Sequence, residues 1–505
     1  MNKAVKTVSF IVAATFLSKV FGLLRDVFIG SFYGTGAEAT AFLSASSIPV
    51  LFFDLTLGAA ILSSFIPVFN GYLKKGDTKK AFEFSNSFIN LVFLITFAFC
   101  IVGSIFSQTL VNVIAPGLDP AVKKLTGQLL IILLPTTVFT GLAYCVVGIL
   151  QSFDEFNIPA VISLVSNVAV IAYLWLFNSK FGVYGLAAAM LFGWSLQLFI
   201  QLPSLKKKGY RYSFKIDIKN EGIREVVRIS VPILIGSWVQ PITVLINKNF
   251  ASYMNGGSAV SALDYANRLF IIIVGVFAFA ITNYIFPSVS RIDTETEGSE
   301  FVSVMKTSIR SIVLIVAPIF AGMMILSREI ITIVYARGEF NELSVKLCST
   351  ALFYYSVGMI SYGVNEIINK CFYAMKKAYA PMLASLCGIA VTVVLSLFLK
   401  NIGIGGLALS ASLGLITVTV ILSFMVNKIF SGFIDAPFLT SVFKTLLCTA
   451  VMAAAGIAVR HFTANLGSIV CTACTVIVCA PVYFVLQYIS GNQELRSVMA
   501  RREKE

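Results

Sequence analysis

Residues 380–399 read APMLASLCGIAVTVVLSLFL, and residues 403–426 read GIGGLALSASLGLITVTVILSFMV. Neither stretch contains a charged residue. A helix needs about 20 apolar residues to cross the hydrocarbon core of a bilayer, and both stretches reach that length. They therefore predict two neighbouring membrane-spanning helices that are joined by a short turn at 400–402.

The composition indicates that the whole chain is built in this way. Of its 505 residues, 58% are hydrophobic and 12% are charged, whereas a soluble domain has about 45–50% apolar and about 25% charged residues. The polar residues are too few to cover a water-soluble globule, so lipid must contact much of the surface. The net charge of +14 then predicts basic cytoplasmic loops and no binding of nucleic acid.

Stretches with the length and apolarity of a span predict an all-α integral membrane protein of about fourteen transmembrane helices. The predicted spans are 8–32, 39–69, 82–106, 125–150, 158–177, 183–202, 226–254, 260–289, 302–326, 343–375, 380–399, 403–426, 438–459 and 466–489. Most Lys and Arg residues fall in alternate loops, together with the N-terminus and the C-terminal tail. This bias places both termini in the cytoplasm, which requires an even number of spans.

The chain offers little for metal or redox chemistry. The single His461 excludes a site that needs two histidines, and the nine cysteines lie almost entirely in apolar runs. Cys471 and Cys474 form a C-x-x-C pair inside an apolar stretch without charged neighbours. We therefore expect no metal and no cofactor.

The sequence also repeats itself at an offset of about 221 residues. Residues 182–187 read GVYGLA and residues 403–408 read GIGGLA, while APG at 115–117 returns as ARG at 336–338. Each copy holds six spans, an even number, so both copies insert with the same orientation. Two such lobes are typical of a transporter with a cavity between them, although a duplication kept only for packing would give the same pattern.

The repeat sets the predicted domain boundaries. These are an N-lobe at 1–205, a cytoplasmic amphipathic linker at 206–225, a C-lobe at 226–430, two extra C-terminal helices at 431–490 and a cytoplasmic tail at 491–505. The linker begins with KKKGYRY at 206–212. It is equally compatible with a helix lying on anionic lipid and with a solvated connection.

Charged residues inside the first span point to a site. A charge at the bilayer centre costs at least about 2.5–3.5 kcal/mol on insertion scales, so such residues usually face a partner or a water-filled cavity. Ser18, Gly22 and Arg25 share one stripe of the helix, and Lys19 and Asp26 share the neighbouring stripe. The gap left by the glycine would let another backbone or a ligand approach.

The second half adds Lys248, Arg268 and Lys370 at membrane depth. Asp264 precedes Arg268 by four residues, and Glu366 precedes Lys370 by four, so each pair could simply neutralise itself along its helix. An excess of positive charge in a central cavity is unfavourable unless an anion enters. A pyrophosphate is such an anion, and arginine binds it with paired hydrogen bonds.

These residues resemble the MurJ (MviN) family of lipid II flippases, within the MOP transporter superfamily. The first-span motif of the family runs Ser-Arg-x-x-Gly-x-x-Arg-Asp, and residues 18–26 read SKVFGLLRD. The eighth span is similar to the family's Tyr-Ala-x-Arg-Leu, with YANRL at 265–269, and RGEF at 337–340 is similar to Arg-Gly-x-Phe. The resemblance covers nearly the whole chain, including its last two spans.

The resemblance implies a cavity whose arginines bind the lipid pyrophosphate. The residues predicted to bind it are Lys19, Arg25, Lys248, Arg268 and Lys370, and those predicted to support them are Ser18, Gly22, Asp26 and Asn267. The chain departs from the family in three places. Thr40 replaces an expected acid, Phe52 to Asp54 stand where an arginine is expected after Pro49, and Lys376-Lys377 removes an acid of a sodium site.

The expected function is that of a flippase that moves lipid II across the bacterial inner membrane by alternating access, without enzymatic chemistry. We expect a monomer among membrane lipids, driven by the membrane potential or by ions. One alternative is a flippase for another polyprenyl-linked oligosaccharide. Another is an ion-coupled small-molecule exporter of the MATE type, with Asp54 or Glu366 as the ion carrier. A lipid-sugar transferase would need metal-binding acids or histidines, which the short loops do not offer.

Overall fold

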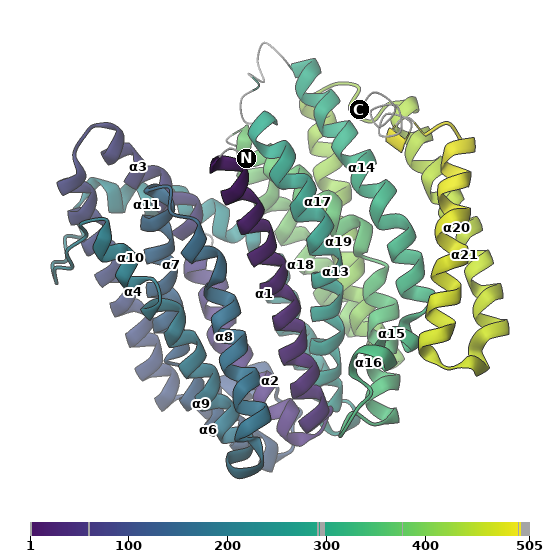
Figure 1. Ribbon diagram of the computed structural model, residues 1–505, viewed down its shortest axis with the longest axis horizontal. Coiled ribbons are helices and arrows are strands. Elements are labelled where there is room, and N and C mark those ends of the chain that lie inside the picture. The colour runs from purple at the N-terminus through teal and green to yellow at the C-terminus, as the bar shows by residue number, and fades with distance from the viewer. Residues whose placement is uncertain are drawn as a thin grey trace. The chain divides into compact units, whose positions relative to one another are not determined.

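The computed structural model describes residues 3–58, 61–289, 292, 298–375, 377–492 and 494–495, and these residues form helices and loops without a strand (Figure 1). They divide into two compact units. The first unit holds Met1–Ser261 and Arg337–Phe340, and the second holds Ala262–Ala336 and Asn341–Glu505. The predicted cytoplasmic tail at 491–505 lies almost entirely outside the described residues.

The first unit contains the N-terminal helices, drawn from purple to teal in Figure 1. They are α1 (Lys3–Tyr33), α2 (Ala37–Phe53), η1 (Asp54–Gly58), η2 (Ile61–Phe65), α3 (Ile66–Lys74), α4 (Thr78–Ile105), α5 (Ser107–Ile114), α6 (Pro120–Leu133), α7 (Thr136–Ser152), α8 (Asn157–Leu176), α9 (Asn178–Phe199), α10 (Leu202–Lys207), α11 (Glu221–Ser237), α12 (Val239–Ala251) and η3 (Asn255–Gly257). The segments η1 and η2 are π-helical, so the second predicted span is not a uniform α-helix.

The second unit contains the remaining helices. They are α13 (Ser258–Val289), whose first residues belong to the first unit, α14 (Gly298–Ile325), α15 (Ser327–Tyr335), α16 (Glu342–Ser356), α17 (Met359–Ala374), α18 (Tyr379–Leu399), η4 (Lys400–Ile402), α19 (Ile404–Ile429), α20 (Ala436–Thr463), η5 (Ala464–Leu466) and α21 (Ser468–Ile489). Here α18 packs against α19 and α20 packs against both α21 and α14.

Length and composition qualify eleven of the described helices as membrane spans, or twelve when α16 and α17, which are bent by 49°, count as one. The chain is therefore a multi-pass helical membrane protein. The first and seventh predicted spans lie outside that count. The first forms α1, and the seventh is divided into α11 and α12, which have 17 and 13 residues. The number of fourteen thus stays a prediction.

The boundary between the compact units differs from the boundary predicted between the lobes, because α11 and α12 belong to the first unit. The indole Nε1 of Trp238, at the break between them, donates to the Leu55 carbonyl oxygen at 3.1 Å. The Ser230 hydroxyl on α11 lies 3.0 Å from the Ser64 hydroxyl. These contacts pack the seventh predicted span against the π-helical part of the second. The division into two six-helix lobes stays a prediction.

A cluster of aromatic rings forms the core of the first unit behind this π-helical stretch. The Phe65 ring lies 5.3 Å from that of Phe84 and 5.0 Å from that of Phe88, measured between centroids. All three side chains are buried. Since aromatic pairs at such separations stabilise beyond their buried area, they hold η2 against α4.

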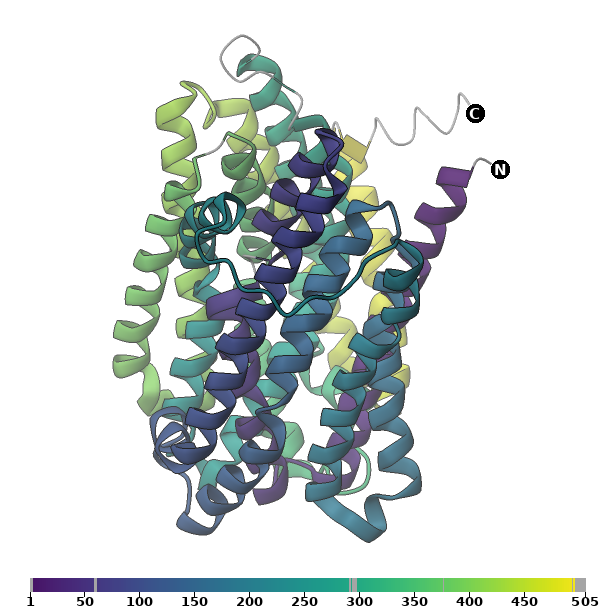
Figure 2. The same ribbon diagram turned by 90° about the vertical axis from the view of Figure 1, so that its left-hand side faces the viewer.

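Residues 210–217 of the linker form no helix, so this part does not adopt the helix on lipid that was one of the two expectations. Two asparagines of α4 hold it. Asn86 Nδ2 donates to the carbonyl of Arg211, while Asn90 Nδ2 donates to those of Ser213 and Lys215. Figure 2 shows this segment as a thin tube that runs across neighbouring helices. We call residues 209–217 the strap.

Backbone geometry supports the internal repeat. Gly182 has φ 52° and ψ −145°, and Gly403, its counterpart at an offset of 221, has φ 80° and ψ −151°. Both angles lie in a region that only glycine adopts without strain. The other repeated loop makes matching contacts: Gly117 N donates to Ser252 Oγ at 2.8 Å, and Glu339 N donates to the Ser31 carbonyl at 2.8 Å.

Candidate functional site

The first unit brings the predicted first-span residues together around Arg25. Its Nε and Nη2 donate to Asp26 Oδ1 at 3.1 and 2.9 Å, and its Nη1 donates to Asn167 Oδ1 at 3.0 Å. The guanidinium carbon lies 5.9 Å from the centre of the Trp194 ring, within the range of a cation–π contact. Helices α1, α8 and α9 thus supply one group each beside or around the same cation. We call Arg25, Asp26, Asn167 and Trp194 the Arg25 cluster.

The helical stripe predicted from Ser18, Gly22 and Arg25 faces α8. Asn167 Nδ2 donates to the carbonyl of Ser18 at 3.2 Å. A Cβ at Gly22 would come within 3.4 Å of that same nitrogen. The glycine therefore leaves room for a side-chain amide of a neighbouring helix, whereas the sequence suggested a backbone or a ligand in this gap.

The charge of Arg25 is balanced within the Arg25 cluster. The Arg25 side chain is 15% exposed and forms an ion pair with Asp26, which is buried. The pair is neutral overall, so burying it costs much less free energy than burying a lone charge. The Arg25 guanidinium stays partly exposed. Its described hydrogen bonds use three of its five N–H donors, which leaves two for a ligand.

The two lysines of the first unit that were predicted as ligands differ in burial. Lys19 is half-buried on α1. Lys248, on α12, is 2% exposed, and its Nζ donates to the carbonyl of Leu43 on α2 at 2.9 Å. In this conformation the Lys248 ammonium is out of a ligand's reach and joins two helices.

The remaining predicted ligands belong to the second unit. Asn267 and Arg268 are half-buried on α13, four residues beyond Asp264 in the case of the arginine. Lys370 is half-buried on α17, close enough to Glu366 to interact with it electrostatically. A single cavity that collects all these cations stays a prediction.

Two residues of the Arg25 cluster were missed in the sequence. Asn167 lies within an otherwise apolar predicted span, and Trp194 is one of only three tryptophans in the chain. A lone amide in such a span is a usable signal, since it needs a hydrogen-bond partner inside the bilayer. The tryptophan carries no comparable signal, because large aromatic residues are common in apolar helices.

Among the described residues, no three His, Cys, Asp or Glu side chains come together in a group that could hold a metal ion. Eight of the nine cysteines are buried or half-buried, and all nine are free thiols. The chemistry available at the site is therefore that of fixed charges and hydrogen bonds.

Comparisons with known proteins agree over most of the chain. The family model described as "Lipid II flippase MurJ" matches residues 29–477. A probable lipid II flippase MurJ from Buchnera aphidicola subsp. Schizaphis graminum is 30% identical over 79% of this chain and 78% of its own length. One from Thermotoga maritima is 26% identical over 99% of both chains.

Solved structures share the fold. A structure described as lipid II flippase MurJ in an inward closed conformation has a TM-score of 0.82 and 24% identity, and it covers 95% of this chain and 98% of its own. An inward-facing multidrug resistance MATE transporter of the MOP superfamily has a TM-score of 0.68 and 14% identity over 83% of this chain and 96% of its own.

The chain shares its multi-pass helical fold with a class of solved membrane transporters that includes members of the MOP superfamily. Within that class, the family model and the relatives agree on one branch. The chain belongs to the lipid II flippase MurJ family.

Proposed function

We propose that this chain moves lipid II from the inner to the outer leaflet of the bacterial inner membrane, with both termini in the cytoplasm. The observation that carries the proposal is the Arg25 cluster, in which the family's first-span motif holds a partly exposed arginine inside a spanning helix. Membership of the lipid II flippase family supports this substrate.

The Arg25 cluster suits a pyrophosphate. Asp26 and Asn167 fix the orientation of the guanidinium and leave two N–H donors for phosphate oxygens. A guanidinium fixed in this way loses little entropy when it binds an oxyanion in a bidentate geometry. Lys19 adds a second cation on the same helix. In our proposal the headgroup contacts these residues while the polyprenyl tail stays in lipid.

Arg268 and Lys370 would complete the path in the second half of the chain. We propose an alternating-access cycle in which the headgroup passes from the cations of one half to those of the other. The chain acts as a monomer and makes or breaks no bond. The sequence has no Gly-x-x-x-x-Gly-Lys-Ser/Thr motif for nucleotide binding, and the membrane potential or an ion gradient supplies the energy.

An ion-coupled exporter is the second candidate, favoured by the fold shared with a MATE transporter. A flippase for another polyprenyl-linked oligosaccharide would use the same pyrophosphate contacts and differ only in its headgroup. The N–H donors that Arg25 keeps for a ligand, together with the charge of Lys19, favour an anionic substrate over the cationic compounds that such an exporter would carry.

The test is the accessibility of lipid II in the outer leaflet of cells depleted of their own flippases. Expression of this chain should restore it, while Arg25→Ala together with Arg268→Ala should abolish it. Full activity of that double variant would remove the proposed site. Restored efflux of cationic dyes without restored lipid II accessibility would favour the exporter.

A further inference from the structure

A separate polar cavity lies within the first unit, among α2, α7, α8 and α9. Its volume is about 210 Å³. Its oxygen-bearing lining residues include Ser46, Asp54, Thr136, Thr137 and Thr140. Sites for drug-sized molecules usually have about 300–1,000 Å³. The cavity is thus suited to an ion with some of its water and is small for an organic molecule.

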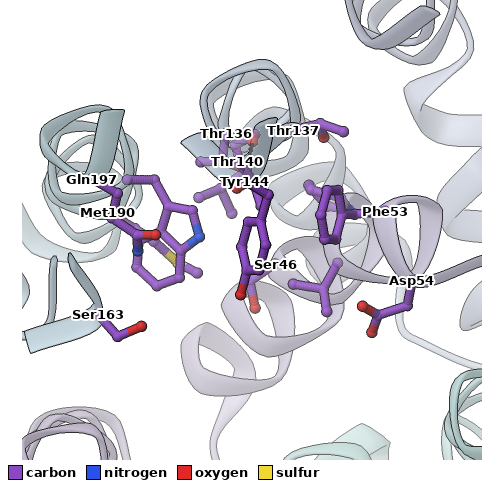
Figure 3. A pocket seen from close by; sticks show the side chains of 14 residues that line it. Ser46, Phe53, Asp54, Thr136, Thr137, Thr140, Tyr144, Ser163, Met190 and Gln197 are labelled. Carbon is purple, nitrogen blue, oxygen red and sulfur yellow. Dashed lines mark hydrogen bonds between the residues drawn. The ribbon is translucent and has the colours of Figure 1, made fainter. Parts of the chain in front are cut away.

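The charge of this cavity is negative. Asp54 is the one charged side chain among the described residues that line it. Figure 3 shows its carboxylate turned toward the side where Tyr144 and Ser46 lie. The Tyr144 ring lies 5.2 Å from the ring of Phe53, the residue before Asp54, measured between centroids. One carboxylate without a cation among these lining residues attracts a single positive charge and repels a pyrophosphate.

A second observation points to a missing ligand. The Thr137 side chain is 1% exposed, and its hydroxyl oxygen has no hydrogen-bond partner among the described residues. Leaving such a group buried and unpaired has a cost. A cation at the cavity would accept the free lone pairs of this hydroxyl, as Thr136 and Thr140 could also supply theirs.

The backbone at Asp54 is unusual as well. Asp54–Gly58 forms a π-helical turn directly after α2. Such turns are rare and occur often at functional sites. A Cβ at Gly58 would approach Asp54 Oδ1 within 3.5 Å, so the carboxylate folds back over its own turn.

We propose that this cavity binds a small monovalent cation, sodium, with Asp54 as the charged ligand and threonine hydroxyls as neutral ligands. Carboxylate and hydroxyl oxygens are the hard donors that such an ion prefers. The site is distinct from the Arg25 cluster, but the two share a residue: Trp194 lines the cavity and also lies under the Arg25 guanidinium. Cation occupancy can therefore influence the Arg25 cluster through one ring, a coupling that rests on the proposed function, whereas the binding itself does not.

The first test measures binding of radiolabelled sodium to the purified full-length chain, with choline as the replacing cation. The wild-type protein should bind sodium saturably, and Asp54→Asn should weaken the binding about tenfold or more. Glu83→Gln is the matched control, because it removes an exposed carboxylate of α4 in the first unit that does not line the cavity. It should bind like the wild type. No saturable binding by the wild type, or loss in Glu83→Gln with retention in Asp54→Asn, overturns the proposal.

The second variant is Thr137→Val, which keeps the shape of the side chain and removes the unpaired hydroxyl. If Thr137 is only structural, this change should leave the thermal unfolding midpoint in choline equal or higher and leave sodium binding unchanged. We expect an equal or higher unfolding midpoint in choline together with sodium binding weakened several-fold. Unchanged sodium binding in Thr137→Val and in Asp54→Asn contradicts the site, whatever the outcome of transport assays on lipid II.

Discussion

Two helices that the internal repeat relates, α1 and α12, each carry a cation that was predicted to lie at membrane depth, and the two cations differ in their contacts. On α1, Arg25 is 15% exposed, forms an ion pair with Asp26 and donates a hydrogen bond to Asn167. On α12, Lys248 is 2% exposed and donates to one backbone carbonyl of α2. Their positions differ by 223 residues, so they are not strict counterparts at the offset of 221.

The difference shows how burial divides a functional charge from a structural one. A guanidinium with free donors and partial exposure can exchange a partner for a ligand. An ammonium that is enclosed and bonded to a carbonyl cannot do so without moving its helix, because an unpaired buried charge is costly. We therefore expect transport to depend on Arg25 much more than on Lys248, although the sequence placed both in the same predicted site.

The change expected to have the largest effect is Arg25→Gln combined with Asp26→Asn. It removes both charges together, so no buried carboxylate is left unpaired, and amide hydrogen bonds can replace the ion pair. We expect folded protein at near wild-type levels and a loss of lipid II transport of about a hundredfold or more. Each ionised hydrogen bond contributes about 1.5–3 kcal/mol, and a factor of ten corresponds to about 1.4 kcal/mol. Transport near the wild-type rate would break the comparison.

Asn167→Ala should have the next largest effect. It removes the hydrogen bonds to Arg25 and to the Ser18 carbonyl. We expect the rate of outer-leaflet exposure of lipid II to fall about tenfold, because the guanidinium loses one of the groups that orient it. Asn167→Gln is the control, because it keeps the amide group but places it one methylene farther from the backbone. An unaffected rate in Asn167→Ala would mean that Asp26 alone orients Arg25.

Lys248→Met tests the other side of the comparison. The methionine fills most of the volume but leaves the Leu43 carbonyl without this donor, so the free energy of unfolding should fall by about 1–2 kcal/mol. Thermal unfolding of the purified protein measures this loss. Transport per folded molecule should stay within about twofold of the wild type. A hundredfold loss of transport with unchanged stability would return Lys248 to the substrate site.

The smallest effect belongs to an ion pair near the ends of two spans, between Lys306 on α14 and Asp435, the residue before α20. The hydrogen bond from Lys306 and that from the backbone N–H of Phe438 lower the pKa of Asp435 below its ordinary value. A lowered pKa adds stability above the ordinary carboxyl pKa, and this stability is lost as the pH falls through the folded pKa. We expect Asp435→Asn to reduce stability slightly at pH 7 and not at strongly acidic pH, with no change in transport. Unfolding midpoints over this pH range measure it, and a difference independent of pH would assign the effect to helix capping.

Much of this fold can be predicted from the sequence because apolar length is a strong signal. The apolar stretch at 380–399 became α18 with almost the same bounds. The broken helices are harder to predict. Trp238 divides α11 from α12 through a hydrogen bond to a distant helix, and the π-helical turns after Asp54 depend on packing that a single sequence does not display.

The candidate site shows the same division. The spacing of Ser18, Gly22 and Arg25 correctly predicted one helical stripe, because helix periodicity fixes which residues share a face. The partner across that stripe, Asn167, lies 142 residues away from Arg25 and could be placed only by the fold. The burial of Lys248 is likewise a tertiary property, since it depends on the approach of α2.

The strap that crosses α4 also limits how the chain can change its length. Loops usually tolerate inserted residues. Here the register of the strap is fixed, because the two α4 asparagines donate hydrogen bonds to the carbonyls of Arg211, Ser213 and Lys215. One residue inserted or deleted between 211 and 215 would move these carbonyls out of register with the two amides. Natural variants of this connection should therefore gain or lose residues outside 211–215.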